Sequence, residues 1–235
     1  MKNVILAGLL SLFILHPAYS QNKVYTENNS EIIFSFADVE YMGNNVPTNM
    51  RFTLFLHLGQ NFNYDFTNNI GMYSGYGLRN IGLITDENGI KIKRRTYALG
   101  IPLALKIGSF SDHFYVYGGG SYELFFHYKQ KLFIEGNKTK YSEWFSDRTE
   151  RFAPSLFAGV QFPGGVNLKF KYYLNNFLNR DFRGVDFGEA VDYANFNQTK
   201  IFYVALTYNI KSSKLKQMTN PEEKSVRFAH NSGEN

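Results

Sequence analysis

The chain has 235 residues, a formal net charge of +5 and no cysteine, which excludes a disulfide framework and a lipid-modified cysteine. Its 25 basic and 20 acidic residues are dispersed, so the sequence gives little reason to expect a nucleic-acid partner. The 17 tyrosines, 23 phenylalanines and 20 glycines favour a β-barrel at a membrane.

The first 20 residues have the pattern of a secretory signal peptide. Lys2 supplies a positive charge, 4–15 is apolar, and 17–20 provides small residues before Gln21. This run is too short to span a membrane, and no later stretch approaches the ~20 apolar residues of a membrane helix. We therefore expect a cleaved signal peptide over 1–20 and an exported protein.

Eight segments with a two-residue period follow, separated by turn residues and without helical periodicity. The strands are expected at 32–42, 51–59, 70–84, 91–108, 113–131, 151–162, 166–177 and 199–211.

Each segment is divided into a bulky apolar face and a face of small or charged residues. The clearest case is the apolar line formed by Tyr97, Leu99, Ile101, Leu103, Leu105 and Ile107. In 114–128 the same rule places Phe126 and Tyr128 on the apolar face and His127 on the other. The apolar face could line a soluble ligand-binding barrel or face lipid. An eight-stranded interior is too narrow for so many large side chains, so we expect them to face lipid.

The opposite face then lines the lumen. Its charged residues are Arg51, Arg79, Lys106, Glu123, Lys169 and Lys171. They could form an ion pathway, but a narrow lumen and the cost of unpaired buried charge favour a paired network. Turning Lys169 or Lys171 towards lipid would cost ~2–4 kcal/mol each near the midplane.

The connections alternate between short turns and long loops. The short ones, 109–112 and 163–165, belong on the periplasmic side, and the long ones, 43–50, 132–150 and 178–198, on the outer side. The stretch 60–69 breaks this rule, because a short turn is expected there. Pro102 cannot donate a hydrogen bond within a closed sheet, so we expect a bulge near 100–102.

The loop 178–198 mixes charges and aromatic rings. Its candidate interaction residues are Asp181, Phe182, Asp186, Phe187, Asp192 and Tyr193. One interpretation is a surface recognition site, because loops on a rigid barrel commonly carry recognition. The other, which we favour, is a hydrated loop that packs on 132–150.

The run YALGIPLAL at 97–105, together with the eight segments, resembles the small outer-membrane β-barrel proteins of the OmpX/OmpA-like and PorT-like porin family. The resemblance covers about 22–211, and in particular Tyr97, Ile101, Pro102 and Leu103 match the pattern of the family's fourth strand. It implies an all-β, eight-stranded antiparallel transmembrane up-and-down barrel over 21–211. Outer-membrane lipid and lipopolysaccharide would be its surroundings, and a secretion system or surface ligand a possible partner.

The last segment resembles the signal read by the barrel-assembly machinery, with Tyr208 and Ile210 at its paired hydrophobic positions. The polar stretch 212–235 departs from the family, which commonly ends near its last strand. It is expected to be a flexible periplasmic tail.

The sequence offers no catalytic set. His57 and His127 lack the serine two residues later that the lipid A deacylases carry, and none of the histidines has metal-ligand spacing. We therefore expect a non-enzymatic barrel without cofactor or metal, with a structural or interaction role. The alternatives are a membrane-embedded lipid A-modifying enzyme and a soluble exported binding barrel.

Overall fold

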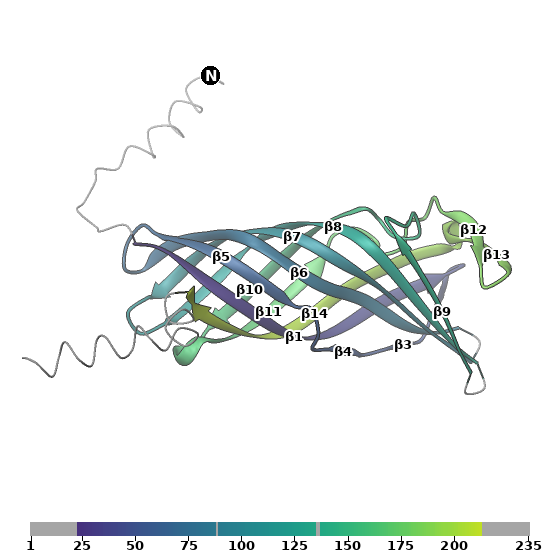
Figure 1. The fold of residues 1–235 in the computed structure, drawn as a ribbon, viewed down its shortest axis with the longest axis horizontal. Coiled ribbons are helices and arrows are strands. Elements are labelled where there is room, and N and C mark those ends of the chain that lie inside the picture. Colours follow the sequence, from purple (N-terminus) through teal and green to yellow (C-terminus); the bar gives the residue numbers. More distant parts are fainter. Residues whose placement is uncertain (1–22, 88, 135–136, 213–235) are drawn as a thin grey trace, which may run out of the picture.

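The computed structural model describes residues 23–87, 89–134 and 137–212; the expected signal peptide and nearly all of the expected tail lie outside them. Eight antiparallel strands form the wall (Figure 1). They are β1 (Lys23–Tyr41), β5 (Leu58–Asp65), β6 (Ile70–Glu87), β7 (Ile90–Ser109), β8 (Phe114–Ile134), β10 (Phe152–Gln161), β11 (Val166–Tyr173) and β14 (Phe196–Lys211).

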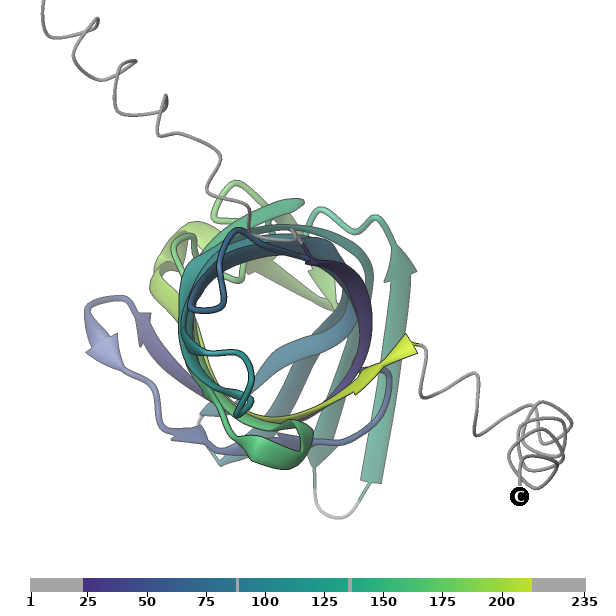
Figure 2. The same cartoon turned by 90° about the vertical axis from the view of Figure 1, so that its left-hand side faces the viewer.

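The wall closes into a ring, seen along its axis in Figure 2. The first and last strands pair from Glu27↔Lys211 to Tyr41↔Phe196, and β8 pairs with β10 across the β9 hairpin. The eight-stranded antiparallel barrel expected from the sequence is therefore confirmed. Apart from a break in the second strand, closure leaves this wall without a free edge, as a membrane requires of a sheet.

The two faces of the wall have opposite chemistry. On β7, Leu99, Ile101 and Leu103 are 47–63 % exposed on the outside, whereas Ala98 and Ala104 are buried inside. Phe170 on β11 is exposed on the outside, and its neighbours Lys169 and Lys171 are buried inside. A continuous outer belt of large apolar side chains has no function in water, so the barrel spans a membrane.

The second strand differs from the expected 51–59. It is broken into β3 (Thr48–Asn49), β4 (Arg51–Thr53) and β5, and Phe55 in the break is 79 % exposed on the outer side. β4 pairs only with β1, and β3 pairs with β6, so neither short strand by itself connects β1 to β6 across the break. Side chains complete it: Ser35 donates to the carbonyl of Gly82, and Arg51 donates to that of Asn80.

Because β5 continues to Asp65, the connection that follows is a short turn after all. The strand was not expected beyond 59 because Asn61, Asn63 and Asp65 carry no apolar signal. The turns 66–69, 110–113 and 162–165, the last of which contains the 3-10 helix η1 (Pro163–Gly165), lie at the end of the barrel where β1 begins.

The bulge expected at 100–102 lies elsewhere. Pairing of β6 with β7 lapses for two residues opposite Pro102 without a change of register, and Ser74 donates to the carbonyl of Pro102. The register shift lies instead between Tyr97 and Ala98, where β8 has one extra residue. A shift of one residue exchanges the two faces of a strand. Tyr128 is therefore buried inside and His127 lies on the outer face, opposite to expectation.

The long loops gather at the other end. There β8 continues past the wall and pairs with β9 (Asn137–Trp144), and β12 (Arg183–Asp186) pairs with β13 (Glu189–Asp192) (Figure 1). The short β2 (Asn44–Asn45) and the 3-10 helix η2 (Tyr193–Asn195) complete this loop end. Among the described residues, no helix has the length and apolar character needed to cross a membrane.

Candidate functional site

A chain of buried charges crosses the lumen. Arg79, on β6, lies between two carboxylates: its guanidinium is 3.2 Å from Glu31 of β1 and 3.3 Å from Glu123 of β8. Lys169 of β11 contacts the Glu31 carboxylate, and Lys171 of the same strand contacts that of Glu123. All five side chains are at most 10 % exposed, so four strands are joined through the middle of the barrel.

Neutral groups complete this set, which we call the lumen network (Glu31, Arg79, Glu123, Lys169 and Lys171). The Tyr173 hydroxyl donates to Glu123 at 2.6 Å, and Lys171 donates to the Ser121 hydroxyl at 2.6 Å. Buried ions are stable only when they are paired and hydrogen-bonded, and every member of this set has such partners. The network therefore holds opposite walls together through the middle of the lumen.

Two of the six charges expected in the lumen lie apart from this network. Arg51 is buried in the broken part of the wall, where it donates to the Asn80 side chain at 2.6 Å. Lys106 lies nearer the turn end and contacts Asp65 at 2.7 Å and the Tyr25 hydroxyl at 3.1 Å. Glu31, which sequence reasoning missed, is the acid that completes the network.

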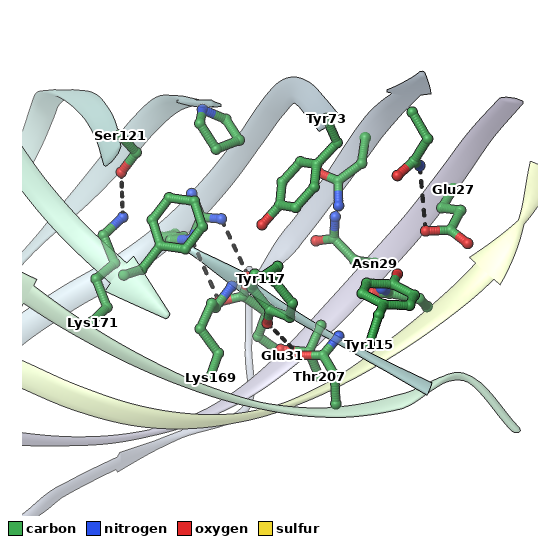
Figure 3. A pocket seen from close by; sticks show the side chains of 17 residues that line it. Glu27, Asn29, Glu31, Tyr73, Tyr115, Tyr117, Ser121, Lys169, Lys171 and Thr207 are labelled. Carbon is green, nitrogen blue, oxygen red and sulfur yellow. Dashed lines mark hydrogen bonds and ion pairs between the residues drawn. The ribbon is translucent and has the colours of Figure 1, made fainter. Parts of the chain in front are cut away.

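A small polar cavity lies between the lumen network and the turn end (Figure 3). Its lining includes Glu27, Asn29, Tyr73, Tyr117 and Lys169, with the tyrosine rings projecting into the lumen. The cavity volume is about 30 Å³, which is room for on the order of one or two water molecules. A cavity of this size does not form a wide aqueous path.

The loop half of the lumen is filled by apolar side chains instead. This inner plug comprises Ile33, Ile81, Leu83, Phe125, Tyr128, Phe177, Leu178, Tyr193, Phe196 and Ile201, all buried. The alternation of apolar and small residues predicted small side chains in this part of the lumen. The register shift in β8 and the loop 174–195 place aromatic side chains there instead. Tyr193 and Phe196 meet edge to face with ring centroids 5.6 Å apart.

The two long outer loops are joined by one arginine that sequence reasoning missed. Arg148 lies between the rings of Tyr141 and Phe182, at 4.3 and 4.6 Å from their centroids. It is 2.8 Å from both Glu143 and Asp186, so it pairs with a carboxylate from each loop. Burial lowers the pKa of Arg148, but the Asp186 carboxylate outweighs this and raises the pKa above its ordinary value.

The expected interaction residues of 178–198 are mostly engaged within the loops. Phe182 packs on Tyr193 at 4.9 Å, and the Tyr193 hydroxyl donates to Asp186 at 2.9 Å. Asp192 pairs with Arg183 at 2.7 Å on the exposed β12–β13 hairpin. Phe187 lies at the tip of that hairpin with a positive φ of 51°. Asp181 is exposed. The pKa of Glu150 is raised, first by the burial of Glu150 itself and then by the nearby charge of Asp181.

The remaining candidates lie outside these clusters. Tyr208 is 51 % exposed on the outer face of β14, and Ile210 is partly exposed near the turn end. His57 is buried in the wall, where its ring lies 3.1 Å from the Thr53 hydroxyl. Over 23–87, 89–134 and 137–212 there is no cluster of three or more His, Cys, Asp or Glu residues suited to a metal.

No protein-family model and no curated protein matches the sequence. Several solved outer-membrane proteins are similar in structure. The attachment invasion locus protein Ail of Yersinia pestis, in complex with the heparin analogue sucrose octasulfate, is 16 % identical, with 79 % of this chain and 99 % of Ail covered and a TM-score of 0.35. Neisserial surface protein A is 9 % identical, with 80 % and 96 % covered and a TM-score of 0.39.

A third similar structure is the outer membrane protein OprG of Pseudomonas aeruginosa, which is 12 % identical, with 81 % of this chain and 97 % of OprG covered and a TM-score of 0.36. All three belong to the class of small outer-membrane β-barrels that the sequence resembles. The fold of this chain rests on its own strand pairing, because these scores and identities are low.

The lumen network predicts a large loss of stability when one of its carboxylates is removed. In the variant E123Q, Lys171 and Arg79 lose a charged partner at a buried site. We expect the free energy of unfolding, measured by urea titration in phospholipid vesicles, to fall by about 3–5 kcal/mol.

The outward neighbour supplies the control: Y122F on the same strand should cost under about 1 kcal/mol. The double variant E123L/K171M, which removes both partners, should lose less than the sum of E123L and K171M measured singly. A loss in E123Q no larger than that in Y122F would contradict the network.

Proposed function

We propose that the chain is an integral outer-membrane protein with a non-enzymatic, structural or interaction role, exercised through its loop end. The lumen network is the observation that carries this proposal, because it occupies the interior of the barrel with ion pairs. A barrel that is filled in this way serves as a scaffold. The apolar belt would contact lipid, and Tyr208 and Ile210 would present the assembly machinery with its signal.

The loop end supports an interaction role. Arg148 joins the two long loops into one unit, so their outer surface is held in a defined arrangement. Loops on a rigid scaffold can then bind a partner without first paying a large ordering cost. The exposed β12–β13 hairpin, with Phe187 at its tip and Asp181 just before it in the chain, is the part that a surface ligand or a secretion assembly would reach first.

The filled lumen predicts that the barrel does not act as a diffusion porin. The purified full chain, folded into planar bilayers, should show no stable large-unit openings at moderate voltage, because its lumen charges are paired and its loop half is plugged. A wide porin of known behaviour serves as the positive control. Stable, large, single-step openings would contradict a closed scaffold.

The proposed orientation predicts opposite accessibility for the two ends. Gly188, at the β12–β13 tip, and Gly164, in the η1 turn, both have open space beside their α-carbons, which gives an inserted epitope room to project outward. An epitope inserted after Gly188 should be labelled by antibody on intact cells.

The matched insertion after Gly164 should be labelled only after the outer membrane has been permeabilised. Both variants are first shown to fold by the shift of their mobility on heating. Labelling of Gly164 alone on intact cells, or recovery of the wild type in the soluble periplasmic fraction, would overturn the proposal.

A further inference from the structure

The outer face of the loop end carries rows of like charge. Residues directly opposite each other in a sheet share one face. The pairing of β7, β8 and β9 places Lys93, Lys131 and Lys140 opposite one another in a single row across three strands. The row on one side holds Arg95 and Lys129, and the row on the other side holds Lys91 and Lys138.

These seven side chains form what we call the basic face, and all point outward. The alternate residues on the same strands point inward: Arg94 and Gln130 are buried, and Glu143 pairs with Arg148. In the described part of the chain, none of the seven basic groups forms an ion pair. Asp86 of β6 lies opposite Lys91 in the strand register, at the margin of the basic face.

Like charges directly opposite each other destabilise a sheet. At Lys131, burial and then the charges of Arg95, Lys138 and Lys140 lower the pKa. A row of three lysines costs stability in the free protein and becomes favourable when an anion with several charges lies across it. The basic face is thus suited to a polyanionic ligand.

The position of the basic face identifies the ligand. Immediately towards the barrel lies an aromatic row, Tyr97, His127 and Trp144, in which the rings of His127 and Trp144 stack with centroids 4.1 Å apart. Leu99, the next residue of β7 whose side chain faces outward after Tyr97, begins the apolar belt. Aromatic girdles mark the boundary between hydrocarbon and headgroups in membrane barrels. Rows two residues apart are ~7 Å apart, so the basic face lies at the depth of the headgroups.

We propose that the basic face binds the phosphate groups of lipopolysaccharide in the outer leaflet, with Lys93, Lys131 and Lys140 as its central contacts. The inference rests on the proposed outer-membrane location. A lipid is favoured over a soluble polyanion because belt, aromatic row and basic face are continuous on the same strands. Acyl chains against Leu99 and Ile101 would therefore place phosphates against the lysines.

The single tryptophan of the chain, Trp144, lies in the adjacent row and reports binding directly. The full chain, folded in neutral detergent micelles, is titrated with purified lipopolysaccharide and with the same material after phosphatase treatment, while Trp144 emission is followed. We expect a saturable change with the phosphorylated form that weakens as salt is raised, and a much weaker one with the dephosphorylated form.

The triple variant K93Q/K131Q/K140Q should bind roughly a hundredfold more weakly, since each lysine near an anionic surface contributes on the order of a factor of five. K93R/K131R/K140R should bind like the wild type, which separates charge from packing. R151Q/R180Q/K211Q removes the same charge at positions away from the basic face and should leave binding unchanged. Heating mobility verifies that each variant is folded.

Equal binding of phosphorylated and dephosphorylated lipopolysaccharide, or equal loss in both glutamine variants, would overturn the proposal. Tighter binding of a sulfated polysaccharide than of lipopolysaccharide would also overturn it, in favour of a soluble ligand. Flotation of the wild type with phosphatidylcholine vesicles tests the membrane location separately. A protein that floats but does not distinguish the two lipopolysaccharides refutes the basic face alone.

Discussion

The narrowness of an eight-stranded ring is the constraint on which the rest of the structure depends. Closing eight strands satisfies the backbone but leaves an interior that side chains alone can fill. Most large apolar residues of the wall must therefore lie outside, where only lipid can cover them. Charges placed inside must find partners within a few ångströms, as Arg79 does between Glu31 and Glu123. Membrane location and closed lumen thus have the same origin.

The division of labour along the barrel axis follows from this constraint. The lumen network and the apolar plug fill the interior with paired charges and packed side chains, so the proposed binding falls to the outer surface and the loop end. Arg148 also holds the two long loops together, because each loop contributes one carboxylate and one aromatic ring that contact its guanidinium group. The basic face on β7, β8 and β9 then stands at a fixed height above the belt.

The sequence correctly predicts which side chains face outward wherever the alternation is unbroken, as in β11, in β14 and in β7 from Tyr97 to Ile107. It fails where backbone irregularity changes the register. The extra residue of β8 turns Tyr128 inward and His127 outward, and no local residue type signals it. The first strand was expected from 32, because 23–31 is rich in polar residues that favour strands weakly. Glu31 was therefore missed, and with it the acid shared by Arg79 and Lys169.

Sidedness is tested most directly by quenching tryptophan fluorescence with brominated lipid chains, using Phe157 and Phe170. They lie on paired strands at nearly the same depth, since Phe157 is opposite Lys171 and Phe170 is opposite Ala158. Phe157 is 6 % exposed inside the lumen, whereas Phe170 is 48 % exposed outside. In a W144F background, F170W should be strongly quenched and F157W hardly at all. Quenching of F157W equal to or greater than that of F170W would show that the apolar face points inward and that the barrel does not span a membrane.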